Sequence, residues 1–225
     1  MKRICAVTKI PLALAAVAAA SVAWTQPAFA AGELGGPLVK TGDIAVAFVG
    51  ADAFYSNDVY YFLSIGDIGG ATFLFNNHTS PVGTTVDPDD SALNLGDQAI
   101  FGICVDRSGV DPGPDCQNAD DMFFTGGGEN NPDNIAHTIV WNRADYEAQF
   151  GALDPTLFPP EYDYVVGFED IYGGGDRDFN DAIFAIRGVT VLPEPITMTL
   201  LATGLAGIGG AGLVRKRKEA TARRA

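Results

Sequence analysis

The sequence predicts an all-β fold, specifically an antiparallel β-sandwich of jelly-roll-like character. Apolar residues alternate with polar ones over short segments, as in residues 43–49, where Ile44, Val46 and Phe48 would share one face of a strand. Glycine, proline, asparagine and aspartate separate these segments, which is typical of turn-rich sandwiches and barrels. The length of 225 residues allows one domain or at most two.

Eight segments carry this strand pattern, and one carries a helical pattern. The predicted strands are residues 43–49, 59–65, 71–75, 99–105, 122–125, 135–141, 162–168 and 182–189. Residues 143–150 are predicted to form a helix of two turns. The 162 residues from 31 to 192 are enough to bury a sizeable core, so we expect a single ectodomain there.

The predicted ectodomain is strongly acidic. Residues 31–192 contain 26 acidic residues and five basic ones, a net charge of −21. Phosphate binding requires Lys and Arg side chains that release counterions, so this balance argues against nucleic acid as a partner. Aromatic and β-branched residues occur throughout the segment and argue against disorder.

Residues 1–30 have the pattern of a secretory signal peptide. A basic start precedes an Ala/Leu/Val run at residues 12–23, which is too short to span a bilayer well. Ala28 and Ala30 are the small residues that signal peptidase requires. We expect cleavage after Ala30 and export across the inner membrane, with a retained membrane anchor as the alternative.

The last 33 residues have three parts. Pro193, Glu194 and Pro195 come first, residues 196–214 carry no charge, and residues 215–218 are all Arg or Lys. Nineteen helical residues nearly span the ~30 Å hydrocarbon core of a bilayer. The sequence therefore predicts a single transmembrane helix at 196–214, with the basic cluster on the cytoplasmic side.

This tail, residues 193–225, resembles the PEP-CTERM sorting signal. The resemblance rests on the order of Pro193-Glu194-Pro195, a Gly-rich apolar helix and a terminal basic cluster. It implies that exosortase, a membrane enzyme, recognises and processes the tail. Proteins with this signal are associated with exopolysaccharide and with the surfaces of Gram-negative, often biofilm-forming bacteria. We therefore expect membrane anchoring at least transiently, followed by a cell-surface or extracellular location.

Two cysteines remain after the signal peptide is removed. Cys104 and Cys116 lie in a domain that is predicted to be exported, where thiols oxidise, so we expect a disulfide between them. Neither CxxC spacing nor a nearby histidine accompanies them, which argues against a metal or catalytic role.

The densest group of polar side chains lies between residues 169 and 181. Ca²⁺ accepts six to eight oxygen ligands, and Gly173 to Gly175 would let the backbone wrap around an ion. Carboxylates this close repel one another unless positive charge lies among them, and Arg177 alone cannot balance five. The sequence therefore predicts a Ca²⁺ site with the ligands Glu169, Asp170, Asp176, Asp178, Asn180 and Asp181.

Other interpretations of this segment stay open. The opening D-x-D-x-N is not an EF-hand, because Asp181 and Arg187 stand where that loop needs Gly and Glu. Asp, Asn and Gly are ordinary turn residues, so a purely structural turn is one alternative. The other is a glycoside- or ester-cleaving hydrolase with Glu169 and either Asp176 or Asp178 as acid and base.

The same segment resembles the signature of a domain-of-unknown-function family found near the C-termini of bacterial secreted proteins. The resemblance rests on F-E-D, a Gly-rich gap and D-x-D-F-N-D, and it extends over residues 42–189. In that family the acidic positions define the motif, and an enzymatic role without an assigned reaction has been suggested from them. The resemblance implies an exported β domain and leaves its activity unnamed.

Together these patterns predict a non-enzymatic, calcium-stabilised surface or matrix protein. Its expected partners are signal peptidase and exosortase during export, and then exopolysaccharide. A secreted hydrolase is the alternative. A lectin-like variant, in which calcium bridges sugar hydroxyls, would stack sugars on Tyr55, Tyr60, Tyr61, Tyr162, Tyr164 and Trp141.

Overall fold

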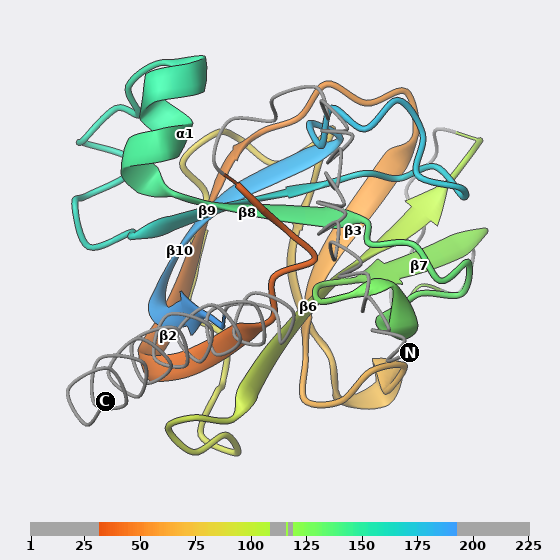
Figure 1. Ribbon diagram of the computed structural model, residues 1–225, viewed down its shortest axis with the longest axis horizontal. Helices are drawn as coiled ribbons and strands as arrows, with labels where there is room; N and C mark the ends of the chain where they lie inside the picture. Colours follow the sequence, from red (N-terminus) through yellow and green to blue (C-terminus); the bar gives the residue numbers. More distant parts are fainter. Residues whose placement is uncertain (1–31, 109–115, 117–118, 193–225) are drawn as a thin grey trace, which may run out of the picture.

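The computed structural model describes residues 32–108, 116 and 119–192 (Figure 1). The predicted signal peptide, the Pro193-Glu194-Pro195 motif and the predicted transmembrane helix at 196–214 lie outside the described residues. Within the described part, none of the helices combines the length and the apolar character needed to cross a membrane.

Strands dominate the described residues, and their pairs are antiparallel, so the predicted all-β antiparallel class is confirmed. A single α-helix accompanies these strands. The elements in chain order are β1 (Glu33–Leu34), β2 (Leu38–Gly50), β3 (Ser56–Phe62), the 3₁₀ turn η1 (Ile68–Gly70), β4 (Thr72–Asn76), β5 (Thr85–Val86), β6 (Gln98–Asp106), β7 (Asp121–Phe124), the 3₁₀ turn η3 (Gly128–Asn130), β8 (Thr138–Asn142), α1 (Arg143–Phe150), β9 (Tyr164–Phe168) and β10 (Ala182–Val191).

The strands form one open sheet in the order β1-β8-β9-β10-β2-β6-β3-β4, with β5 beside β2 and β7 beside β6. Only Leu38 and Val39 of β2 pair with β6, so the sheet has two halves joined at a narrow seam. Phe184 of β10 lies 5.7 Å from Phe75 of β4 and 5.4 Å from Phe101 of β6, measured between ring centroids. The two halves therefore face each other across a shared core. The structure is one open sheet that folds back on itself, and in this respect it resembles the predicted sandwich.

The alternation predicted for β2 is confirmed by its two faces. Ile44, Val46 and Phe48 lie in the core between the halves, whereas Ala45 and Ala47 face a second cluster that packs beneath α1. Successive side chains of a strand point to opposite faces, so a strand buried on both sides alternates between two cores. β2 therefore contributes side chains to both hydrophobic clusters, one on each of its faces.

The predicted helix at 143–150 is confirmed by α1. Asn142 caps its N-terminus, because Asn142 Oδ1 accepts the N–H of Asp145 at 2.9 Å. Gly151 ends it with a φ of 105°, a conformation that favours glycine. Trp141 and Phe150 bring their ring centroids to 5.5 Å, which holds the helix against β8.

Each predicted strand overlaps an observed one, but the positions differ in places. β1 and β5 escaped prediction because two-residue strands have no periodicity to detect. β3 begins at Ser56, three residues before the prediction, since Ser56, Asn57 and Asp58 are turn-forming types in sequence. All three are buried in the structure, with exposed fractions of 2%, 0% and 3%. Asn57 contacts Asp170 of the site described below, whereas Ser56 and Asp58 both accept hydrogen bonds from the side chain of Asn76.

The predicted disulfide is present: Cys104 of β6 is joined to Cys116, with their Cα atoms 5.7 Å apart. Cys104 is fully buried and packs with Tyr60 and Phe62 of β3. The bond therefore ties the segment between β6 and β7 to the outer face of this half of the sheet.

We predict that replacing both Cys104 and Cys116 by alanine lowers the free energy of unfolding by about 3 kcal/mol. The closed ring has a sequence separation of 12, and loop-closure entropy gives about this value for a ring of that size. Urea denaturation of the oxidised full-length chain and of the variant measures the difference. A reductant should destabilise the native chain and leave the variant unchanged; equal stability of the two proteins would contradict the prediction.

Candidate metal centre

The acidic motif occupies the end of β9, the loop that follows and the start of β10. Glu169 and Asp170 come directly after β9, and residues 171–181 form the loop. Because Phe168 of β9 pairs with Ala182 of β10, the two ends of the loop lie side by side. This is the strand–loop–strand arrangement that brings residues from both ends of the motif together.

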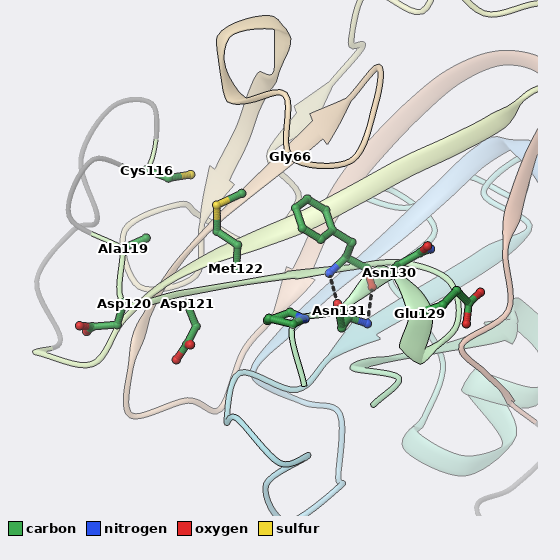
Figure 2. A pocket seen from close by; sticks show the side chains of 11 residues that line it. Gly66, Cys116, Ala119, Asp120, Asp121, Met122, Glu129, Asn130 and Asn131 are labelled. Carbon is green, nitrogen blue, oxygen red and sulfur yellow. Dashed lines mark hydrogen bonds between the residues drawn. The ribbon is translucent and has the colours of Figure 1, made fainter. Parts of the chain in front are cut away.

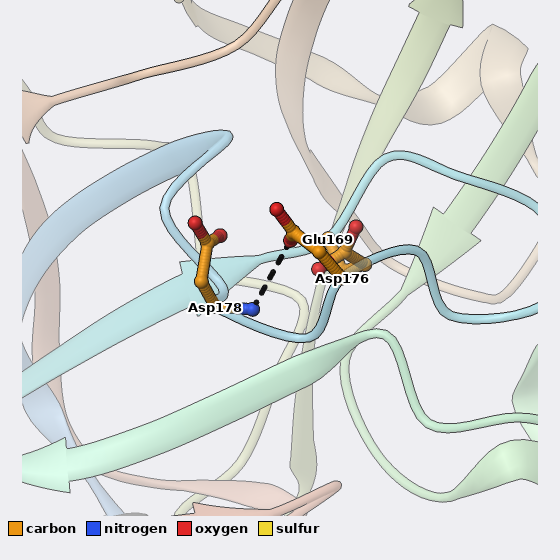
Figure 3. A group of neighbouring side chains, drawn as sticks. All are labelled: Glu169, Asp176 and Asp178. Atoms are coloured by element: carbon orange, nitrogen blue, oxygen red, sulfur yellow. Dashed lines mark hydrogen bonds between the residues drawn. The ribbon is translucent and has the colours of Figure 1, made fainter.

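Five carboxylates gather in two groups that share Glu169. The outer group is Glu169, Asp176 and Asp178, and the inner group is Glu169, Asp170 and Asp181. In each group, one oxygen from each residue lies within 4.8 Å of the others. Figure 3 shows the three side chains of the outer group gathered together. Both groups are arranged so that they could hold a metal ion.

The two groups differ in their access to solvent. Glu169 and Asp170 are only 1% and 2% exposed, and Asp181 is half-buried. Asp176 and Asp178 are exposed. The inner group is therefore a largely buried cluster, and the outer group is its solvent-facing side.

Residues 176–180 form two successive turns of the same kind, in each of which an aspartate side chain faces the backbone N–H two residues later. The N–H of Asn180 donates to Asp178 Oδ1 at 3.2 Å, and the N–H of Asp178 faces Asp176 Oδ1 at 3.4 Å. Between these residues, Arg177 and Phe179 have φ values of 63° and 55°, which non-glycine residues rarely adopt. Such conformations persist where the surroundings impose them, and they cluster at functional sites.

Asn180, the sixth predicted ligand, belongs to neither carboxylate group. Its side-chain N–H donates to Asp178 Oδ2 at 2.6 Å, and its carbonyl accepts the N–H of Asp52 at 2.9 Å. Asn180 therefore orients Asp178 and ties the loop to the segment after β2.

Gly175 is required by the close approach of the loop to Glu169. A Cβ at Gly175 would lie 1.8 Å from Glu169 Oε1, and the φ of +40° disfavours other residues as well. Gly173 and Gly174 also have positive φ values, of 90° and 82°. Gly175 therefore lets the backbone pass close to the Glu169 carboxylate, while the predicted wrapping of this segment around an ion stays a prediction.

The buried carboxylates receive few donors. Glu169 Oε2 accepts the N–H of Arg177 at 3.0 Å, and Asp181 Oδ2 accepts the N–H of Asp170 at 2.9 Å. Asp170 Oδ2 accepts a side-chain N–H of Asn57 at 2.7 Å. Across the described part of the chain, the ion pairs involve other residues, and none of the five carboxylates is paired with Lys, Arg or His.

Burial and repulsion both favour the protonated forms of these groups. Desolvation, followed by repulsion from Asp176 and Asp178, raises the pKa of Glu169 to about 7. Desolvation and the neighbouring Asp170 raise the pKa of Asp181 to about 8, and desolvation raises the pKa of Asp170 as well. When several of these carboxyl groups ionise together they repel one another strongly, and a bound cation would remove this repulsion.

A second hydrogen-bonded unit supports the site from the segment just before β8. His137 is fully buried; its Nδ1 donates to the carbonyl of Glu169 at 2.9 Å, and its Nε2 is hydrogen-bonded to Asp133 Oδ2 at 2.8 Å. Asp133 Oδ2 also accepts the N–H of Gly173 at 2.8 Å. Burial opposes ionisation of Asp133, but the hydrogen bonds from Gly173 and His137 outweigh it and lower the pKa of Asp133.

The opposite half of the sheet supplies two amide side chains. Asn57 of β3 contacts Asp170, and Asn77, just after β4, donates to the carbonyl of Asp181 at 3.1 Å. The inner group therefore lies where the two halves meet at one end of the core. Asn57, Asn77, Asp133 and His137 were not predicted as neighbours of the site, because nothing in their local sequence patterns connects them to residues 169–181.

Residues 106–189 match a family described as a domain of unknown function, DUF4114. The DUF4114 match includes the whole acidic motif and the strands from β7 to β10. It supports the resemblance to a domain-of-unknown-function family, over a shorter range than residues 42–189. The strands β1 to β5, with Asn57 and Asn77, lie outside it. Searches of curated proteins and of solved structures found no match.

A separate hollow of about 610 Å³ lies near the disulfide, and its lining includes Cys116, Met122 and Asn131 (Figure 2). None of the six acidic-motif residues lines it. Two of its three acidic lining residues are already engaged, Asp120 by the N–H of Arg107 and Asp121 by the Arg107 guanidinium; the third is Glu129. The hollow therefore does not extend the acidic site.

We predict that, with divalent cations chelated, the domain is more stable near pH 5 than near pH 8.5. A carboxyl whose pKa is higher in the folded chain binds more protons when folded, so the free energy of unfolding falls as pH rises above the ordinary pKa values of 4.5 and 3.8 and levels off once pH exceeds the folded values of about 7 and about 8. For Glu169, the rise from 4.5 to about 7 corresponds to roughly 3 kcal/mol.

Urea denaturation in EDTA across this pH range measures the trend. The double variant Glu169→Gln, Asp181→Asn removes the two titrating groups and should flatten the profile. A stability that rises with pH in the native chain would show that these carboxylates are not destabilising when ionised.

Proposed function

We propose that the chain is an exported surface or extracellular-matrix protein whose sandwich-like β domain is stabilised by Ca²⁺ bound at the acidic motif. The convergence of five carboxylates around buried Glu169, without an ion pair, carries this proposal. Burying carboxylates is unfavourable unless positive charge compensates them. Oxygens that share an ion at 2.3–2.6 Å lie no more than about 5 Å apart, and the oxygens of each group meet that limit at 4.8 Å.

The donor set favours calcium over other metals. The two groups offer only carboxylate oxygens, which suit hard cations, whereas Zn²⁺ and Cu²⁺ sites use His and Cys. The nearby His137 has both ring nitrogens in hydrogen bonds. Mg²⁺ demands a near-octahedral geometry and keeps several waters, which suits the crowded inner group less well than the flexible coordination of Ca²⁺.

The hydrolase alternative has one supporting observation. A pKa of about 7 for Glu169 is suitable for a general acid at neutral pH. However, catalytic carboxylates flank the bond that they cleave and stand roughly 5–9.5 Å apart, whereas the oxygens here converge. Glu169 is also only 1% exposed, which disfavours contact between its carboxyl group and a substrate in solution. We therefore favour a non-enzymatic role.

The export part of the proposal rests on the two ends of the sequence. Residues 1–30 would direct secretion, and residues 193–225 would be recognised by exosortase and place the protein at the surface, in association with exopolysaccharide or biofilm. A lectin-like role has less support, because Tyr60, Tyr61 and Trp141 are 3%, 1% and 3% exposed and cannot stack on sugars.

We predict that Ca²⁺ raises the melting temperature of the full-length chain and that EDTA reverses the effect. At free Ca²⁺ one hundred times its dissociation constant, linkage adds about 2.7 kcal/mol to the free energy of unfolding. Differential scanning calorimetry and isothermal titration measure the shift and the binding. A chain that neither binds Ca²⁺ nor changes its melting temperature would refute the calcium part of the proposal.

Variants of the site separate specific binding from general screening of charge. Glu169→Gln should abolish most of the calcium-induced shift, because Glu169 belongs to both groups. Asp178→Asn should weaken only the outer group. Glu161→Gln removes one exposed charge outside the site and should leave the shift unchanged. An equal loss in all three variants would indicate screening.

We predict that deleting residues 193–225 releases the protein from the membrane fraction and prevents its surface display. The tail holds the apolar segment and the Pro193-Glu194-Pro195 motif. Cell fractionation of the full-length and truncated chains measures the distribution, and replacement of the tripeptide by Ala-Ala-Ala tests sorting without loss of the apolar segment. An unchanged distribution of both variants would refute the sorting proposal.

A further inference from the structure

A buried oxygen without a partner lies beside the inner group. Asn57 has an exposed fraction of 0%, and its side-chain N–H donates to Asp170 Oδ2 at 2.7 Å. The oxygen of the same carboxamide, Oδ1, is buried and has no hydrogen-bond partner among the residues that the structure describes. Buried polar atoms in native proteins are almost always paired, so an unpaired one next to an acidic cluster indicates a missing partner.

The neighbouring Asn77, in contrast, has hydrogen-bond partners for both the oxygen and the nitrogen of its side-chain amide. Its Oδ1 accepts the N–H of Asn57 at 2.8 Å, and its Nδ2 donates to the carbonyls of Tyr55 and Asp181, each at 3.1 Å. Both ends of Asn77 are therefore used. The two side chains are similar in type, burial and location, and only Asn57 keeps an oxygen unused.

A hydrogen-bond donor or a cation can satisfy such an oxygen. Asn57 contacts Asp170, which forms the inner group with Glu169 and Asp181, and these carboxylates accept hydrogen bonds when they are ionised. A cation held by these carboxylates is attracted to an amide oxygen as well, and asparagine carbonyls are ordinary Ca²⁺ ligands. A neutral ligand also completes the coordination without adding to the local negative charge.

We propose that Asn57 Oδ1 is a ligand of the inner ion and completes the Glu169, Asp170 and Asp181 group from the opposite half of the sheet. This inference rests on the proposed calcium site and deepens it. The ion then joins β3 in one half to β9 and β10 in the other. It adds to two contacts that already cross at this place, between Asn57 and Asp170 and between Asn77 and Asp181.

This role makes the ion a cross-link at the open end of the core. The halves are joined through β2 and β6 by only two residue pairs, at Leu38 and Val39. Asn57 lies outside residues 106–189, the range of the DUF4114 match. The carboxylates of the motif would therefore depend on a ligand from the part of the domain that precedes the match.

Two substitutions at one position distinguish a ligand from a hydrogen-bond donor. Asn57→Leu removes both the oxygen and the N–H that donates to Asp170. Asn57→Asp removes the same N–H but keeps an oxygen in place and adds a charge, which strengthens Ca²⁺ binding where it coordinates. Asn77→Asp is the matched control, because Asn77 also contacts the inner group, through the main-chain carbonyl of Asp181, but its side-chain oxygen already accepts the N–H of Asn57. Isothermal titration of the full-length chains with CaCl₂ measures affinity and stoichiometry.

If Asn57 is a ligand, Asn57→Leu weakens Ca²⁺ binding by roughly tenfold or more, whereas Asn57→Asp binds at least as tightly as the native chain. Asn77→Asp lowers the melting temperature equally with and without Ca²⁺ and leaves the affinity unchanged. Unaltered binding by Asn57→Leu overturns the inference, as does equal weakening in both Asn57 variants, which would mean that the residue only orients Asp170. Absence of binding by the native chain overturns the proposed function itself.

Discussion

The burial of Glu169 and Asp170 at the end of β9 is the constraint on which the rest of the site depends. Their position is fixed by the sheet, because the N–H of Glu169 donates to the carbonyl of His137 at 2.9 Å and its own carbonyl accepts from the His137 ring. Phe168, the residue before them, is fully buried in the core. The backbone of Glu169 is therefore held in place by its contacts with His137, and Glu169 and Asp170 are only 1% and 2% exposed.

The loop at residues 171–181 is shaped to accommodate the Glu169 carboxylate. Gly175 leaves room for the Glu169 carboxylate, and Arg177 adopts a left-handed conformation that directs its N–H toward Glu169 Oε2. Asp133 holds the N–H of Gly173 from the other side. Hydrogen bonds from backbone N–H groups reduce the repulsion only in part, since the pKa of Glu169 still rises to about 7. The repulsion that remains among the carboxylates is the physical reason to expect a bound cation.

Local patterns in the sequence predicted what local interactions determine. The alternation of Ile44, Val46 and Phe48 identified the face of β2 that lies between the halves. The helical pattern of residues 143–150 identified α1. The crowding of acidic residues located the site, because its five carboxylates come from one strand–loop–strand unit. Long-range contacts were not predictable in this way. Asn57 meets Asp170 across 113 positions, and its neighbours Ser56 and Asp58 have the composition of a turn.

A weakly bound ion would suit the proposed export of this domain. Extracellular calcium modules bind at about 10⁻⁴–10⁻³ M, far more weakly than the cytosolic sensors. A site of that strength would be empty before export, when the acidic cluster destabilises the fold, and would be filled outside, where the ion joins the two halves of the sheet. The disulfide between Cys104 and Cys116 acts on the other face of the β3–β6 half and forms under the same conditions. Both stabilising elements would therefore take effect in the compartment that the two ends of the sequence predict.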